Sequence, residues 1–170
     1  SKFDLISGPH RGLFDIFVGN FPTNLDALRW RQAVYSRHSK KKSILSAFPK
    51  PPCPGESEHS VSGREIYAKE IAAALGSDVD YIACGSTIDV AAARSYKFVL
   101  AFEIANCVSW VTAPLYTAFA AGAIPVYRGA IDARPHFVPN ASAVAFAEDY
   151  QNPEELASHL KRVSKDKQLF

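Results

Sequence analysis

The sequence predicts an α/β fold in which helices cover both faces of a parallel β-sheet. Strand-like apolar runs alternate with segments of helical periodicity along most of the chain. Several of these runs are apolar on both faces, as strands buried between two helical layers are. Capping residues stand in front of the helical segments. Together these features are typical of a doubly wound parallel sheet.

The composition is that of one globular domain. The chain has 170 residues, of which 48% are hydrophobic and 21% charged, and this balance allows a sizeable core. The net charge of +2 at pH 7 gives no electrostatic reason to expect nucleic acid as a partner. No apolar run is long enough for a membrane span, and no signal-peptide pattern opens the chain. The absence of Met suggests a piece of a longer protein.

Cysteine and histidine give no sign of a metal site. Cys53, Cys84 and Cys107 are odd in number and lack CxxC spacing. This excludes a disulfide scaffold and a zinc signature but leaves one bridge possible. The histidines are scattered, and each is interpreted as a surface or structural residue rather than a ligand. They are His10, His38, His59, His136 and His159.

Residues 1–42 are predicted to be an N-terminal segment with a linker helix. A Thr23 cap with Asp26 three residues later predicts a short helix over residues 23–38. The basic run from Lys40 to Lys42 is interpreted as a solvated approach to the first strand.

The domain proper is predicted over residues 43–170 and opens with a strand, Ser43–Phe48. Residues 49–63, rich in Pro and Gly, form a long loop. Ser62 and Glu65 have the spacing of a capping box, and the apolar residues that follow predict a helix. Arg64 lies in its first turn, where backbone N–H groups and the helix dipole favour an anion.

The second half of the chain continues the alternation. Strands are predicted over residues 79–85, 96–103, 123–129 and 142–148. A polar bend over residues 104–111 follows the second of these strands. A helix is predicted to begin near Thr112, because Pro114 suits a first turn and Gly122 suits a helix end. Asn152 is predicted to cap the last helix.

The predicted fold points to one ligand crevice. Ligands of doubly wound sheets bind beyond the carboxyl ends of the strands. We therefore expect the loop leading to Arg64, the bend after Glu103 and the loop after Gly129 to line it. No G-x-G-x-x-G, P-loop, G-x-S-x-G or H-E-x-x-H motif occurs, so classical dinucleotide, P-loop, serine hydrolase and zinc protease sites are unsupported.

The order of several motifs resembles the carboxy-terminal half of the α-1,3/1,4-fucosyltransferases, glycosyltransferase family 10. The motifs are "YKFVLAFE", the bend, "VT", "LYTAFAAGAIPVYRG", "HFVP" and "NPEELASHLKRV", and the match runs from about Ser43 to the end. The resemblance implies a Rossmann-like domain that binds GDP-fucose as one half of a GT-B glycosyltransferase. It also implies that the acceptor-binding half, with the catalytic base, precedes Ser1.

This resemblance carries a set of functional expectations. The complete enzyme would transfer L-fucose from GDP-fucose, with inversion, to a hydroxyl of an N-acetylglucosamine-containing glycan in an α-1,3 linkage, without a metal. Such transfer needs a base on the acceptor side and charge stabilisation on the diphosphate side. We expect this chain to supply only the second, to hold no catalytic residue and to be inactive alone. The parent is expected to be a type II membrane protein of the Golgi lumen, anchored upstream.

The resemblance assigns donor-binding positions, each with a plainer alternative. Arg64 matches the diphosphate-contacting arginine, or is a surface helix residue. Ser46 ends the first strand near the nucleotide, or is a turn residue. Glu103 contacts the ligand or orders the bend. Trp110 stacks on a base or sugar, or packs in the core. Thr112 belongs to the retained V-T pair at the helix start.

The chain departs from the family pattern at Ile104, Ala113 and Pro114, where the family has Asn, Glu and Lys. Losing a Lys at a helix start removes a point charge for the diphosphate, and Pro also removes an N–H. Arg128 and Arg134 could compensate, or be solvated loop residues. A degenerate, non-catalytic nucleotide-sugar-binding or structural module is therefore the alternative to an enzyme.

Asn140-Ala141-Ser142 forms an N-x-S sequon. It predicts glycosylation at Asn140 if the protein enters a secretory lumen, and is otherwise a chance tripeptide.

Overall fold

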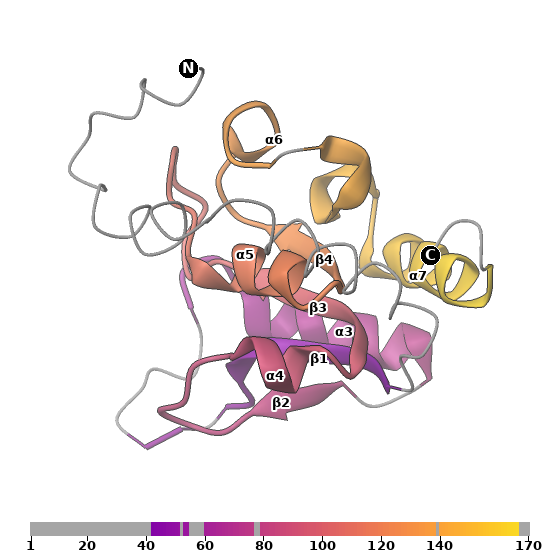
Figure 1. Ribbon diagram of the computed structural model, residues 1–170, viewed down its shortest axis with the longest axis horizontal. Coiled ribbons are helices and arrows are strands. Elements are labelled where there is room, and N and C mark those ends of the chain that lie inside the picture. The colour runs from indigo at the N-terminus through magenta and orange to yellow at the C-terminus, as the bar shows by residue number, and fades with distance from the viewer. Residues whose placement is uncertain (1–41, 52, 55–59, 77–78, 139, 167–170) are drawn as a thin grey trace, which may run out of the picture.

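The computed structural model describes residues 42–166, except residues 52, 55–59, 77, 78 and 139. These residues form a parallel sheet in the order β2-β1-β3-β4-β5 (Figure 1). The strands are β1 (Lys42–Pro49), β2 (Asp80–Ile82), β3 (Tyr96–Phe102), β4 (Ile124–Arg128) and β5 (Ala145–Phe146). The α-helices are α3 (Arg64–Leu75), α4 (Val90–Ala93), α5 (Ala113–Ala120), α6 (Ala133–His136) and α7 (Pro153–Lys165). The predicted doubly wound α/β fold is confirmed. The predicted helix over residues 23–38 and the rest of the N-terminal segment lie outside the described residues.

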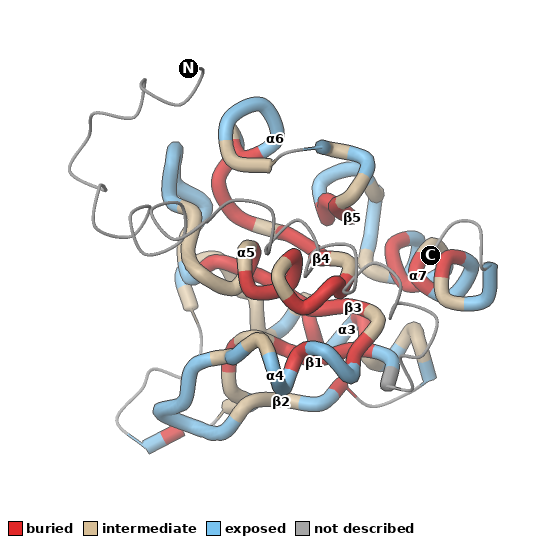
Figure 2. Tube along the Cα trace, in the orientation of Figure 1, coloured by how far each residue is buried: buried red, intermediate tan, exposed pale blue. Residues whose placement is uncertain are grey.

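Helices cover both faces of the sheet. In Figure 1, α4 and α5 lie in front of the sheet and α3 lies behind it. Side chains of β3 alternate between the two layers. Phe98, Leu100 and Phe102 join the cluster formed with α3 and α7, whereas Val99 and Ala101 face the α4 and α5 side. Figure 2 shows that buried residues concentrate in the central strands and α5, so the core is two-layered, as the apolar runs predict.

The last helix is capped as the sequence predicts. The Asn152 side chain accepts a hydrogen bond of 2.8 Å from the Glu155 N–H, which satisfies an otherwise unpaired donor of the first turn. The apolar stripe of α7, Leu156, Leu160 and Val163, is buried in the cluster that it shares with α3 and β3. The periodicity of this segment therefore predicts both the helix and its buried face.

Helix α5 also begins and ends near the predicted residues. Thr112 is the N-cap, Pro114 lies in the first turn, and Gly122 follows the end with a φ of 64°. This left-handed conformation strains residues that carry a Cβ, which explains the glycine.

The two edge strands are shorter than predicted. The strand expected over residues 79–85 is limited to Asp80–Ile82, because the chain then turns, with the Ser86 N–H donating to the Ala83 carbonyl at 3.0 Å. The strand expected over residues 142–148 is limited to Ala145–Phe146, between the 3-10 helices η2 (Ala141–Ala143) and η3 (Ala147–Asp149). An edge strand has a neighbour on one side only, so an apolar run there need not be strand throughout.

The predicted capping box is also wrong. Gly63, with φ 64°, occupies the N-cap of α3 and makes no side-chain cap. Glu65 instead accepts hydrogen bonds from Ser60 N–H and Oγ at 3.0 and 2.7 Å. The Ser62 hydroxyl donates to the Glu103 carbonyl at 2.6 Å. The Ser62 side chain, which local spacing places at the helix cap, therefore makes a tertiary contact with Glu103 instead.

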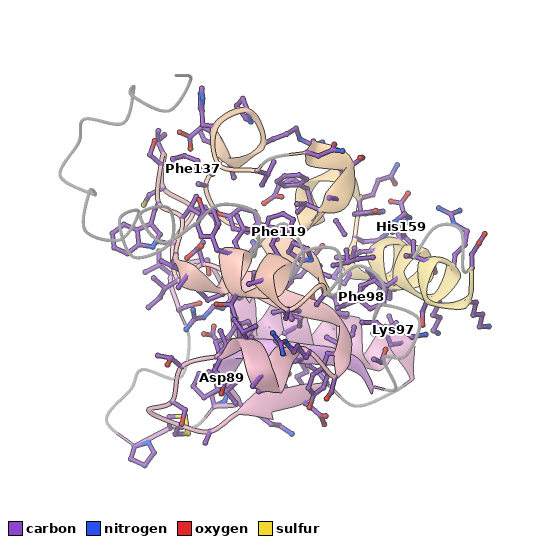
Figure 3. All side chains as sticks on the ribbon, in the orientation of Figure 1. Asp89, Lys97, Phe98, Phe119, Phe137 and His159 are labelled. Atoms are coloured by element: carbon purple, nitrogen blue, oxygen red, sulfur yellow. A yellow bond between two sulfur atoms is a disulfide. The ribbon has the colours of Figure 1, made fainter. Side chains whose placement is uncertain are left out.

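One disulfide fixes the loops that follow β1 and β2. Cys53 and Cys84, 31 residues apart, are bonded, while Cys107 is free and exposed. The sulfur–sulfur bond appears in yellow in Figure 3. The single bridge that the cysteine count allows is thus between Cys53 and Cys84.

Candidate functional site

The three loops expected to share a crevice meet at the carboxyl edge of the sheet. The Ser62 N–H, before α3, donates to the Ile104 carbonyl of the bend at 3.0 Å. The Arg128 guanidinium, at the end of β4, donates to the Ser62 carbonyl at 2.5 Å. The Glu103 N–H donates to the Arg128 carbonyl at 2.8 Å. This network confirms that the loops lie together, because each is bonded to another.

Glu103 holds the bend against the start of α5. Glu103 is 3% exposed, and its carboxyl group accepts hydrogen bonds from the Thr112 N–H at 2.8 Å and the Thr112 hydroxyl at 2.7 Å. Burial raises the pKa of Glu103, although the Thr112 bonds and the nearby Arg64 charge oppose this shift. Burial and then the Glu103 charge raise the pKa of Tyr116 to about 12. The geometry therefore gives Glu103 the ordering role, one of its two predicted alternatives.

Gly129 makes room for this buried carboxyl group. A Cβ on Gly129 would lie 2.4 Å from the Glu103 Cγ and 2.7 Å from the Tyr127 hydroxyl oxygen. That hydroxyl oxygen accepts a hydrogen bond of 3.0 Å from the Ala130 N–H, so it cannot move away without losing the bond. Only glycine fits here without displacing the groups that order the bend.

The tip of the bend is strained and is held by the loop after β4. Ser109 has a φ of 57°, in the left-handed region that residues with a Cβ rarely adopt. Asp132 accepts hydrogen bonds of 2.7 Å from both the Ser109 N–H and its hydroxyl. These hydrogen bonds lower the pKa of Asp132 below its ordinary value. Such strain is more common at binding sites than elsewhere.

Arg64 reaches the same edge from α3. Its Nη1 donates to the Phe102 carbonyl at 3.4 Å, and its Nε donates to Glu65 at 2.9 Å. The guanidinium lies 4.7 Å from the centre of the Phe48 ring. Arg64 is half-buried, so it is a positioned residue rather than a freely solvated one.

The two arginines predicted as compensating cations have different positions. Arg128 lies in the network described above, with its guanidinium 5.1 Å from the centre of the Tyr67 ring. Arg134 forms an ion pair with Asp149 and lies 4.2 Å from the centre of the Phe146 ring. Among the described contacts of these two arginines, those of Arg128 connect it to the loop before α3 and to the bend, whereas the ion pair of Arg134 is with Asp149.

The two remaining residues predicted to contact the donor, Ser46 and Trp110, differ in their exposure. Ser46 is fully buried, and its hydroxyl donates to the Phe48 carbonyl at 2.8 Å. Ser46 lies inside β1 and pairs with Leu100 of β3, so it does not end the strand and the turn alternative is wrong. Its donor contact stays a prediction. Trp110 is 44% exposed, so the core-packing alternative is wrong and its ring is available for stacking.

The substituted positions leave part of this edge without charged side chains. Ile104 is 49% exposed at the start of the bend. Ala113 and Pro114 form the first turn of α5, which carries no acidic residue. The backbone of this helix start is retained, but its side chains offer no charge.

Sequence reasoning missed several residues that build this edge. Spacing predicts a helix cap for Ser62, and no sequence pattern predicts a role for Gly129 or Asp132. Their partners lie far along the chain, for example 41 residues away for Ser62 and Glu103. No local signal identifies such pairs.

Asn140 is exposed at the cap of η2, and its Oδ1 accepts hydrogen bonds from the Ser142 N–H and hydroxyl at 3.0 and 2.9 Å.

The described ranges contain no helix with the length and apolar character needed to cross a bilayer. Nor do the described residues bring together three His, Cys, Asp or Glu side chains that could hold a metal ion.

Comparisons with known proteins identify the family. The model of the C-terminal region of glycosyltransferase family 10 (fucosyltransferase) matches residues 57–170. GDP-fucose protein O-fucosyltransferase 3 of Xenopus tropicalis is 37% identical over 75 residues, which are 44% of this chain and 16% of that protein. α-(1,3)-Fucosyltransferase B of Drosophila melanogaster is 28% identical in an alignment of 129 residues that covers 65% of this chain and 29% of that protein. The chain therefore spans less than a third of these relatives.

The fold agrees with this assignment. A crystal structure of an α1,3-fucosyltransferase with GDP-fucose matches with a TM-score of 0.59 and 17% identity, over 78% of this chain and 38% of that one. The sheet accordingly has the Rossmann-like architecture of one half of a GT-B glycosyltransferase. Because the family model covers most of its length, the chain belongs to glycosyltransferase family 10, the fucosyltransferases.

Proposed function

We propose that this chain is a donor-binding domain that takes GDP-fucose at the carboxyl edge of its sheet. Joined to an acceptor-binding domain, it would transfer L-fucose with inversion to a hydroxyl of an N-acetylglucosamine-containing glycan, in an α-1,3 linkage. The fucosyltransferase family and the GDP-fucose in the structural relative support this proposal. The observation that carries it is Arg64, held where three loops meet.

The chemistry proposed for this half is stabilisation of the departing diphosphate. Fucose transfer leaves negative charge on the GDP oxygens, and a guanidinium fixed in advance stabilises that charge without reorganising. The hydrogen bonds to Phe102 and Glu65 and the Phe48 ring fix Arg64 in this way. The N–H groups at the start of α5 are a further source of positive potential. Deprotonation of the acceptor hydroxyl is assigned to the other domain, as is any anchor.

The named relatives differ in the class of acceptor. One relative is named as a protein O-fucosyltransferase and another as an α-(1,3)-fucosyltransferase. A transfer assay on the complete enzyme with both a glycan and a folded protein acceptor distinguishes these classes. Transfer to the protein alone would refute the glycan as acceptor.

A secretory location is proposed with the enzyme, namely the Golgi lumen in a type II membrane protein. The Cys53–Cys84 bond supports an oxidising compartment. The exposed Asn140 sequon is compatible with one.

The alternative function is a degenerate module that retains the fold without catalysis. Ile104, Ala113 and Pro114 favour it, because they replace the polar and charged residues of the family pattern. Each lost charged hydrogen bond is worth about 1.5–3 kcal/mol.

Calorimetric titration with GDP-fucose separates these functions. We expect micromolar binding that weakens roughly 10- to 100-fold in Arg64→Ala, the loss of about one charged hydrogen bond. Arg162→Ala is the matched control, because Arg162 is exposed on α7 and contacts His159. Failure to bind any GDP-sugar would support the degenerate module. Preference for another nucleotide sugar would indicate a changed donor.

A further inference from the structure

Arg128 is fixed by contacts on two sides. Its guanidinium donates to the Ser62 carbonyl at 2.5 Å and lies 5.1 Å from the centre of the Tyr67 ring. Its backbone pairs with Phe102 in the sheet register. Arg128 is half-buried, so its charged group is held near the surface and is not sealed in the core.

Arg64 and Arg128 cross each other at this edge. The Arg64 guanidinium bonds to the carbonyl of Phe102, the residue paired with Arg128. The Arg128 guanidinium bonds to Ser62, two residues before Arg64. Each guanidinium therefore bonds to a backbone carbonyl of a residue that is paired with, or near in sequence to, the other arginine.

Three aromatic rings support the two cations. The rings of Phe48 and Phe102 stack with centres 6.1 Å apart, and the ring of Tyr67 meets Phe102 edge-on at 5.7 Å. Arg64 lies over the first ring of this series and Arg128 over the last. A guanidinium can lie over the face of an aromatic ring and still donate hydrogen bonds from its N–H groups, which point outward in the plane of the guanidinium.

Three carboxyl groups lie near the two guanidinium groups, and each accepts hydrogen bonds from the protein. Glu65 is bonded to Arg64, and Glu148, near Arg128, accepts a hydrogen bond from the Gly129 N–H. The Glu103 carboxyl group is occupied by Thr112. Arginine forks match phosphate oxygens in geometry as well as charge.

We propose that Arg128 is a second diphosphate-binding residue, which acts with Arg64 and replaces the charge absent at Ala113 and Pro114. This inference rests on the proposed donor function and deepens it. One arginine contacts each phosphate, so the pair selects a nucleoside diphosphate over a monophosphate. The site thereby retains donor binding with a different arrangement of cations.

The test is calorimetric titration of the purified protein with GDP, GMP and guanosine. In Arg128→Gln, which retains an N–H donor for the Ser62 carbonyl, we expect GDP binding to weaken roughly 10- to 100-fold. GMP binding is expected to weaken less, and guanosine binding to stay unchanged. Arg128→Lys, which keeps the charge but not the fork, is expected to bind GDP with intermediate affinity. Arg162→Gln is the control, and thermal unfolding of each variant checks the fold.

Each other outcome counts against the inference. Equal weakening of GDP, GMP and guanosine would mean that Arg128 only shapes the loop. Unchanged GDP affinity in Arg128→Gln, with a loss in Arg64→Ala, would overturn the role of Arg128 and leave the proposed function standing. No binding of any guanine nucleotide to the unaltered protein would overturn both.

Discussion

The hydrogen bond between Thr112 and Glu103 allows a quantitative test of how the bend is held. Thr112→Val removes the hydroxyl that donates to Glu103 at 2.7 Å and keeps the β-branched shape. The hydroxyl caps no N–H of α5, so no helix cap is lost. Glu103 is 3% exposed, so water cannot readily replace the donor. The expected loss is about 1.5–3 kcal/mol of unfolding free energy, or roughly 5–10 °C in Tm.

The pH dependence gives this prediction a second measurement. Burial raises the pKa of Glu103 above its ordinary value of 4.5. When the pKa of a carboxyl group is higher in the folded state than in the unfolded state, the folded protein becomes less stable as pH rises from the unfolded-state pKa through the folded-state pKa. Thr112→Val removes a donor that opposes the shift, so its deficit relative to wild type should grow as pH rises above 4.5. Glu103→Gln should abolish this growth.

The assay is urea unfolding followed by circular dichroism at a series of pH values. Thr112→Ser, which keeps the hydroxyl, is the matched control and should lie closer to wild type. The reasoning is refuted if Thr112→Val changes stability by less than about 0.5 kcal/mol, the usual range for surface changes. It is equally refuted if the serine variant is as unstable as the valine variant.

Further predictions concern packing, the disulfide and modification. Gly129→Ala should destabilise the fold by about 1–3 kcal/mol through overpacking, and by less in a Glu103→Ala background, as measured by a double-mutant cycle in urea; equal losses in both backgrounds would contradict the contact. Replacing Cys53 and Cys84 with Ala should cost roughly 3.5 kcal/mol for a loop of 31 residues, measured with and without reductant; a wild type that reductant leaves unchanged would speak against the bridge. In secretory expression the protein should carry a glycan removed by an endoglycosidase and absent in Asn140→Gln, detected by mass spectrometry; an unmodified wild type would refute it.

Elements with local signals are predictable from the sequence. The Asn152 cap and the apolar stripe of α7 involve residues within a few turns of one another, so spacing predicts them. The start of α5 at Thr112 followed in the same way from Pro114. The apolar strand runs and the order of motifs predicted the parallel α/β sheet and the family. The meeting of three loops at one edge of the sheet followed from the rule for the carboxyl ends of parallel strands.

The side chains that meet at that edge could be identified only from the folded chain. Spacing predicts that Ser62 caps a helix, whereas in the folded chain its hydroxyl donates a hydrogen bond to the Glu103 carbonyl, 41 residues away. Arg128 and Arg134 look equivalent in sequence, but the first bonds across 66 residues and the second pairs with Asp149. The sequence likewise left the cysteine pairing open. Contacts between distant residues depend on how the strands pack and on which groups burial leaves in need of a partner, and neither has a local pattern.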